Sequence, residues 1–217
     1  MKKPGDILAD ELREAKSPRD YSKAYKKFYT TADSHAAAHI EANKIELACG
    51  NCSYCCHQWV RVLAHEVFAI VDHIQSTSES SKKETIQLLE AYHEKTRHLN
   101  DDEKDRQNMP LPCPFLADGR CSIYSVRPSN CRAFHSLDKD HCESCLKRPN
   151  GWPKTPADES LTKAWTQILK TADFAYHTNN LDQTTYDLVP SCLAALSNPA
   201  LRRRWVSKKK TLLSYDS

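Results

Sequence analysis

Glycine is scarce in this chain, with four residues among 217. The loops that cradle phosphate groups in nucleotide-binding proteins need several glycines at fixed spacing, and no GxGxxG or Walker-type sequence is present. Tight hairpins also depend on glycine, because type I′ and II′ turns need residues with positive φ. The composition therefore argues against a nucleotide-binding loop and favours a mainly α fold.

Long apolar runs are missing as well. No stretch reaches the roughly 18 apolar residues of a membrane-spanning helix. The N-terminal sequence MKKPGDILADELREAK has no apolar core of the kind found in secretory signals. We therefore expect a cytoplasmic protein that makes no membrane contact.

Neither sign of charge dominates, since 31 basic and 28 acidic residues leave a net charge of +3. The basic excess lies in a C-terminal tail, residues 201–217. A solvated tail is the favoured interpretation, and contacts with nucleic acid, in which Trp205 stacks on a base, are the alternative. The basic residues of the tail are Arg202, Arg203, Arg204, Lys208, Lys209 and Lys210.

Cysteine is abundant, with ten residues. Disulfides are rare in a reducing compartment, so clustered thiols there more often bind metal. Nine of the ten fall into two groups separated by a long cysteine-free stretch. Cys192 stands alone, and we expect it to be a buried apolar residue.

The first group has the spacing C-x2-C-x2-C-C and comprises Cys49, Cys52, Cys55 and Cys56. A C-x2-C turn lets two thiolates converge on one metal ion, and three cysteines at successive x2 spacings are also found in bacterial ferredoxins. The adjacent Cys55 and Cys56 point in different directions, so one of them is expected to serve a second metal or to remain a free thiol.

The second group places five cysteines within 33 residues: Cys113, Cys121, Cys131, Cys142 and Cys145. Asp118-Gly119 is a turn sequence that should bring Cys113 and Cys121 together. Cys142-x2-Cys145 forms a second knuckle, flanked by His141. No single spacing in this group is diagnostic, but the combined pattern indicates a metal site.

The combined motif resembles the bacterial YkgJ-type cysteine-cluster family, to which zinc or iron chelation is attributed. The resemblance rests on the first group together with CPFLADGRCSIYSVRPSNCR, and it covers roughly residues 45–135. It implies that Cys49, Cys52, Cys55, Cys56, Cys113, Cys121 and Cys131 form the metal site. Cys142, Cys145 and His141 lie outside this shared core, and we include the two cysteines among the candidate ligands.

The identity of the metal is open between zinc and iron, because thiolates are soft ligands that suit both. The successive x2 spacings and Cys113-Pro114 favour an iron–sulfur cluster, whereas separate knuckles favour zinc. Either metal would fasten the surrounding segment, since metal–thiolate binding contributes on the order of 10 kcal/mol to folding.

Several histidines are weaker candidates. His35 and His39 lie one turn apart on the inward face of a predicted helix, where a pair of core histidines is favoured over a chelating pair. His57 and His135 each follow a cysteine. We expect both to be ordinary histidines, and the alternative is that they are metal ligands or hydrogen-bond donors to ligands.

The pattern of apolar residues predicts helices over 18–47, 64–75, 81–99 and 156–178. Ser17-Pro18-Arg19-Asp20 is a capping sequence, Ser81 and Glu84 suggest a capping box, and Asp182 and Asn198-Pro199 suggest further helix starts. Residues 100–150 contain five prolines, which predicts an irregular segment with short strands at most, around 122–124.

We expect one domain over residues 1–200. It has a cysteine-cluster core at about 45–147, helical flanks at 17–47 and 156–197, and the basic tail beyond. The predicted function is intracellular binding of zinc or iron. The alternatives are an iron–sulfur redox or group-transfer enzyme, which a distant similarity to flagellin lysine methylases also supports, and a zinc-knuckle adaptor for nucleic acid or protein. No substrate or protein partner is indicated.

Overall fold

The computed structural model describes residues 3–48, 52–100, 111–148 and 154–207. Helices dominate these residues and strands are short, which confirms the predicted mainly α fold. None of the helices in these ranges is long and apolar enough to cross a membrane.

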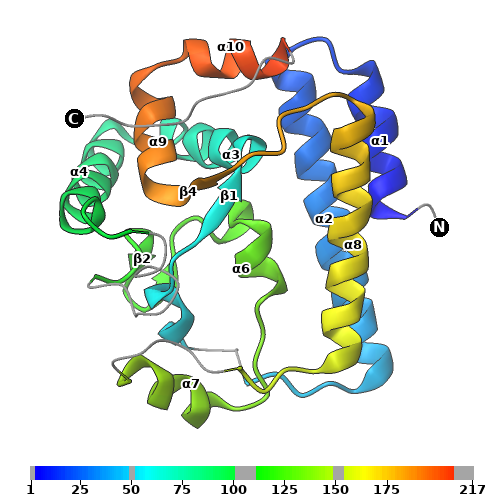
Figure 1. The fold of residues 1–217 in the computed structure, drawn as a ribbon, viewed down its shortest axis with the longest axis vertical. Coiled ribbons are helices and arrows are strands. Elements are labelled where there is room, and N and C mark those ends of the chain that lie inside the picture. Colours follow the sequence, from blue (N-terminus) through cyan, green and yellow to red (C-terminus); the bar gives the residue numbers. More distant parts are fainter. Residues whose placement is uncertain (1–2, 49–51, 101–110, 149–153, 208–217) are drawn as a thin grey trace.

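Three helices pack side by side along one flank of the molecule: α1 (Pro4–Glu14), α2 (Pro18–Asn43) and α8 (Glu159–Thr178) (Figure 1). The predicted start of α2 is confirmed, because the Ser17 side chain accepts from the Asp20 N–H and Asp20 accepts in return. The helix ends at Asn43, four residues before the predicted end, and the capping residue Lys44 has φ of 51°. Helix α1 was not expected from the sequence.

A second group contains α3 (Ala64–Gln75), α4 (Glu79–Thr96), α9 (Leu188–Ser197) and α10 (Ala200–Val206) (Figure 1). The bounds of α3 match the prediction. The predicted capping box of α4 is wrong, because Ser78 rather than Ser81 caps the helix and accepts from the Ser81 N–H. Asp182 accepts from Thr184 N–H in a turn instead of capping a helix.

Two segments far apart in the sequence pair as antiparallel strands, β1 (Arg61–Leu63) and β4 (Thr185–Asp187). Val62 lies opposite Tyr186. Strand β1 follows directly on the first cysteine group, and β4 leads into α9 (Figure 1). This pairing connects the cysteine-rich part of the chain to the C-terminal helices.

The cysteine-rich segment holds a small hairpin, β2 (Leu116–Ala117) and β3 (Arg120–Cys121), followed by α6 (Ser129–Ala133) and α7 (Lys139–Leu146). Asp118 and Gly119 have φ of 50° and 74°, so the predicted turn is confirmed. The strand expected around 122–124 is wrong, since Tyr124–Val126 forms a 3₁₀ turn, η2. Helices in the described part of this segment are short, as its prolines predict.

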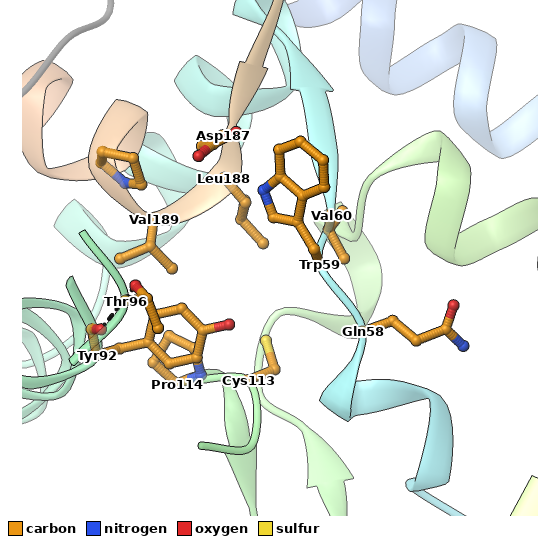
Figure 2. A pocket seen from close by; sticks show the side chains of 11 residues that line it. Gln58, Trp59, Val60, Tyr92, Thr96, Cys113, Pro114, Asp187, Leu188 and Val189 are labelled. Carbon is orange, nitrogen blue, oxygen red and sulfur yellow. Dashed lines mark hydrogen bonds between the residues drawn. The ribbon is translucent and has the colours of Figure 1, made fainter. Parts of the chain in front are cut away.

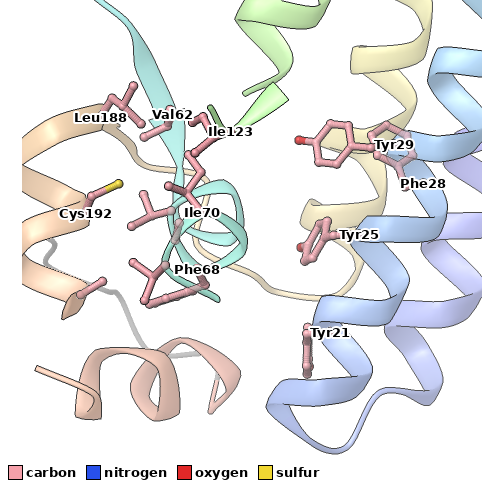
Figure 3. Close-up of a cluster of buried hydrophobic side chains, with 14 of the residues drawn as sticks. Tyr21, Tyr25, Phe28, Tyr29, Val62, Phe68, Ile70, Ile123, Leu188 and Cys192 are labelled. Atoms are coloured by element: carbon pink, nitrogen blue, oxygen red, sulfur yellow. The ribbon is translucent and has the colours of Figure 1, made fainter. Parts of the chain in front are cut away.

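The inward face predicted for α2 is confirmed by the buried side chains of Tyr21, Tyr25, Phe28 and Ala32. Figure 3 shows the three aromatic residues along one side of α2. Cys192 is fully buried on α9, with its sulfur directed toward α3 (Figure 3). The prediction that this cysteine is a core residue is therefore confirmed.

The described part of the basic tail is packed against the core. Trp205 is 3% exposed and its ring contacts those of Tyr21, Tyr25 and Phe68. Arg202 forms an ion pair with Asp72 at 2.6 Å and donates to the Phe68 carbonyl. The suggestion that Trp205 stacks on a base is therefore wrong, because its ring belongs to the hydrophobic core.

Candidate metal centre

The first cysteine group runs into the short 3₁₀ helix η1 (Tyr54–His57). The Cys56 N–H donates to the Ser53 carbonyl, and the Cys56 carbonyl accepts from the Cys113 N–H at 2.6 Å. This second bond joins the two cysteine groups directly. Cys49, a predicted ligand, lies outside the described residues.

Four thiols gather around the β2–β3 hairpin, and we call Cys55, Cys113, Cys121 and Cys131 the hairpin group. Burial raises the pKa of Cys113 to about 11, and neighbouring Cys121 and Cys55 contribute in the same direction. Although Cys131 as a whole residue is exposed, desolvation of its thiol, followed by the effects of Cys113, Cys55 and Cys121, raises its pKa to about 12. Each member thus lies close enough to the others to disfavour its negative charge.

Arg127 is a source of positive charge beside this group. It lowers the pKa values of Cys55 and Cys121, although other effects raise both overall. The guanidinium stacks on the ring of Tyr124 at 3.7 Å, which holds it at the edge of the thiols. This position suits a group that would offset the charge of thiolates.

Three further thiols lie on η1's flank and on α7, and we call Cys52, Cys142 and Cys145 the helix group. Cys142 and Cys145 are buried on one face of α7, because residues three apart lie on the same side of a helix. Helix α7 packs against η1, where the Tyr54 hydroxyl donates to Glu143 at 3.1 Å. Burial raises the pKa of Cys142, a hydrogen bond with Ser136 lowers it, and Cys52, Cys145 and Cys55 raise it further. The two thiol groups are therefore neighbours.

Cys56 is assigned to neither thiol group. It hydrogen-bonds the Cys55 side chain, and this bond is the largest cause of the raised pKa of Cys55. The sequence-based expectation that one member of the adjacent pair is spare remains a prediction.

The predicted histidines divide into two kinds. His39 Nε2 is hydrogen-bonded to Ser160 Oγ at 2.9 Å in the α2–α8 contact, and His135 Nδ1 lies 3.0 Å from the Ala133 carbonyl. In contrast, among the described residues no hydrogen-bond partner is found for the buried Nε2 of His35, Nδ1 of His57 or Nε2 of His141. The last two lie on η1 and α7, beside the helix group.

Within the ranges that the structure describes, no three Cys, His, Asp or Glu side chains are placed so that they could hold a metal ion together. The thiols are neighbours rather than a formed coordination sphere. Their chemistry nevertheless fits the group that the sequence implies, because soft thiolates with nearby imidazole suit zinc and iron. The buried, unpartnered nitrogens of His57 and His141 are a further observation in favour of that fit.

A buried carboxylate that the sequence did not single out anchors the hairpin group. Glu66 on α3 accepts from the Leu63 N–H at 2.8 Å, the Tyr29 hydroxyl at 2.8 Å, and the N–H and hydroxyl of Ser129 at 2.7 and 2.6 Å. Ser129 begins the helix that carries Cys131. Glu66 is 2% exposed, so these bonds tie the position of Cys131 to the helical core.

Arg132 provides a second anchor next to Cys131. Its guanidinium pairs with Asp33 of α2, donates to the Arg127 and Ser125 carbonyls, and lies over the Tyr29 ring. These contacts account for the charge of Arg132 within the protein. Ser129 and Arg132 stand in the motif SNCR, which was the sequence feature that could have pointed to them.

A pocket adjoins the hairpin group between α4, α9 and the segment before β1 (Figure 2). Trp59, Leu188 and Val189 form apolar parts of its wall. Figure 2 shows the sulfur of Cys113 and the hydroxyl of Tyr92 directed into it. Burial, then Cys113 and Asp187, raise the pKa of Tyr92, so the hydroxyl is a neutral donor beside the thiol.

Both thiol groups fall within the segment that a known family model covers. The model, named CxxCxxCC and described as a "putative zinc- or iron-chelating domain", matches residues 48–154. This segment is a CxxCxxCC domain. No match is found among curated proteins or among solved structures. The resemblance seen in the sequence is thus confirmed.

The CxxCxxCC domain extends further than the resemblance indicated. It reaches residue 154 and therefore includes α7 with Cys142 and Cys145, which the sequence left outside the shared core. Helices α1, α2, α8, α9 and α10 lie outside it. The domain supports a zinc- or iron-chelating function.

Proposed function

We propose that this protein binds zinc or iron through the thiolates of its CxxCxxCC domain. The observation that carries the proposal is the gathering of the described cysteines of the domain into neighbouring thiol groups, although they come from separate parts of the sequence. The proposed ligands are Cys49, Cys52, Cys55, Cys56, Cys113, Cys121, Cys131, Cys142 and Cys145, of which one is spare.

The protein's own residues prepare the hairpin group for a cation. The hairpin turn and the Cys113–Cys56 backbone bond set the spacing of the thiols, and Glu66 and Arg132 fix Cys131. Arg127 offsets part of the negative charge that four thiolates would carry. A bound ion would supply the positive charge that makes the thiolates stable, and a cytoplasmic, reducing compartment would keep them from forming disulfides.

The test is elemental analysis of protein purified without oxygen. Replacing Cys49, Cys52, Cys55, Cys113, Cys121 or Cys131 individually with serine should lower the metal content or the soluble yield. Cys192→Ser is the matched control, because Cys192 is buried outside the domain, and it should leave the metal content unchanged. Equal metal content in the wild type and all six variants would contradict the proposal.

An iron–sulfur enzyme is the second candidate, and the pocket beside Cys113 favours it. A hydroxyl donor and apolar walls lie next to a thiol of the hairpin group, and the pocket volume of about 30 Å³ leaves room for a molecule of about the size of water to approach a redox-active centre. A brown protein whose visible absorption is bleached by a reductant supports this function. A colourless protein that contains zinc alone contradicts it.

The adaptor alternative has less support. Arg202 is paired with Asp72 and Trp205 is buried, so Arg203 and Arg204 are the basic side chains left exposed in the described part of the tail. Salt-dependent binding of nucleic acid that disappears when residues 208–217 are removed would restore this alternative.

A further inference from the structure

The hydroxyl of Tyr29 is buried between two ionisable side chains. Tyr29 lies on α2, and its hydroxyl donates to Glu66 Oε1 at 2.8 Å. The Nε2 atom of His65 lies 2.9 Å from the same hydroxyl oxygen. All three residues are buried, and both partners stand in the first turn of α3. A single phenol is thus held between a carboxylate and an imidazole.

The directions of these two hydrogen bonds follow from the number of hydrogens. A carboxylate only accepts, and a phenol carries one hydrogen, so the Tyr29 hydroxyl gives its hydrogen to Glu66. Its oxygen then accepts from His65, which places the hydrogen of the imidazole on Nε2. Burial lowers the pKa of His65, so the imidazole is neutral at pH 7. The phenol therefore has a base at its hydrogen and a donor at its oxygen.

This arrangement favours the loss of one electron from Tyr29. Removing an electron from a phenol makes its hydrogen strongly acidic, and a buried positive charge is costly unless the proton leaves. The Glu66 carboxylate is within the distance at which a side chain accepts a proton directly. The neutral oxygen radical that remains keeps the hydrogen bond from His65, and burial shields it from other molecules.

Two other buried tyrosines contact His65 but do not share this arrangement. Tyr25 lies one turn earlier on α2, and its ring stacks on the imidazole with centroids 3.9 Å apart (Figure 3 shows Tyr25 and Tyr29 on α2). Among the described residues its buried hydroxyl has no hydrogen-bond partner. The Tyr176 hydroxyl lies 3.1 Å from His65 Nε2, a nitrogen that already carries a hydrogen. Tyr29 is therefore the member of the three with a base in place.

Glu66 also connects Tyr29 to the thiols. The oxygen that faces Tyr29 accepts from the N–H and the hydroxyl of Ser129, at the start of α6. Cys131 lies two residues later on the same helix, and the guanidinium of Arg132 is 4.7 Å from the centre of the Tyr29 ring. The phenol is thus in contact with the helix that carries one thiol of the hairpin group.

We propose that Tyr29 is a redox-active tyrosine that donates an electron to a sulfur-centred radical at Cys131. The Tyr29 O–H bond breaks, the proton goes to Glu66 Oε1, and the electron passes to the Cys131 thiyl radical, which takes a proton from water and becomes a thiol. The products are a neutral tyrosyl radical, a carboxylic acid and an intact cysteine. This activity protects the thiols of the domain against one-electron oxidation, and it does not rest on a bound metal ion.

The experiment oxidises the full-length protein with light, ruthenium(II) tris-bipyridine and persulfate, and records the electron paramagnetic resonance spectrum of frozen samples. Every sample carries Tyr124→Phe, because Tyr124 is 63% exposed and would react directly. The reference protein should give a tyrosyl radical. Tyr29→Phe and Glu66→Gln should each lower the radical signal at least about tenfold, since one removes the phenol and the other removes the base. Tyr25→Phe is the matched control and should keep the signal.

Two further measurements guard against variants that fail to fold. Replacing Tyr29 with 3-fluorotyrosine keeps the hydroxyl and its hydrogen bonds, and the spectrum should gain a splitting from the fluorine nucleus. Oxidation of Cys131 to the sulfonic acid, measured by mass spectrometry, should rise at least twofold in Tyr29→Phe and stay at the reference amount in Tyr25→Phe.

The outcomes separate this inference from the proposed function, because none of them depends on metal content. A reference protein without a tyrosyl radical, or a spectrum without fluorine splitting when 3-fluorotyrosine stands at position 29, would overturn the assignment to Tyr29. Equal signal loss in Tyr25→Phe and Tyr29→Phe would overturn it as well. A radical at Tyr29 with unchanged oxidation of Cys131 in Tyr29→Phe would overturn the protective electron donation.

Discussion

Replacing Glu66 with glutamine tests whether the buried carboxylate fastens the hairpin group to the helical core. The carboxylate accepts four hydrogen bonds, three at one oxygen and one, from Leu63 N–H, at the other. Glutamine keeps one oxygen and replaces the other with an NH₂ group, which cannot accept. The fewest hydrogen bonds are lost when the glutamine oxygen takes the position with three donors and the NH₂ group faces the Leu63 N–H. The Leu63 N–H is then unpaired, and the other three hydrogen bonds have a neutral acceptor in place of a charged one.

The expected cost follows from these bonds. An unsatisfied buried donor costs about 1–3 kcal/mol, and a hydrogen bond to a charged group contributes about 1 kcal/mol more than a neutral one. Part of this loss is offset because a buried charge no longer has to be desolvated. We therefore expect Glu66→Gln to lower the free energy of unfolding by about 3 kcal/mol, measured by urea unfolding with far-UV circular dichroism.

Ser129→Ala is the matched control, because it removes the hydroxyl donor and keeps the Ser129 backbone N–H bond. It should cost about 1 kcal/mol alone and less in the Glu66→Gln background, since the two residues share a hydrogen bond. A change below about 0.5 kcal/mol in Glu66→Gln, the size typical of surface substitutions, would refute this account of the anchor.

Three further predictions concern the helical body and the metal-dependent segment. Burial lowers the pKa of His65 to about 4, so the unfolded chain binds a proton below about pH 6.5 that the folded protein excludes. The metal-free protein should then lose about 2 kcal/mol of stability from about pH 7.5 to about pH 5, and an unchanged slope in His65→Gln would contradict this assignment. Chelation under reducing conditions should make the trypsin sites at Arg120 and Lys139 susceptible to cleavage while most far-UV helical signal survives; resistance of these sites would mean that metal does not fasten the segment. The double variant His35→Ala/His39→Ala should lower the melting temperature without changing metal content, and a loss of metal would identify the pair as ligands.

The helices were predictable where local sequence and packing agree. The cap formed by Ser17 and Asp20 sets the start of α2, and the spacing of apolar residues sets the extent of α3. Both signals come from residues close together in the sequence. The start of α4 was misplaced because Ser78 and Ser81 are both plausible caps in the sequence SESS. Helix α1 was missed because two buried leucines, Leu8 and Leu12, lie among charged residues. Its Gly5 permits a close approach to α8, where a Cβ would lie 2.2 Å from the Thr171 Cβ.

The candidate site was predictable only in part, because some of its contacts join residues that are far apart in the sequence. Cys113 and Cys121 are joined by a local turn, so their proximity follows from Asp118-Gly119. The pairing of Cys52 with α7 depends on contacts such as Tyr54 with Glu143, which are 89 positions apart. Glu66 resembles an ordinary charged residue in the first turn of a helix, because its partners Tyr29 and Ser129 come from distant segments.

The amount of zinc and iron in anaerobically purified protein tests the central claim most directly. We predict bound zinc or iron in the wild type and in Cys192→Ser, with less metal in Cys113→Ser and Cys121→Ser of equal helical content. Wild-type protein that is folded yet free of both metals, or variants that keep the full wild-type amount, would contradict the claim that the clustered thiols bind metal.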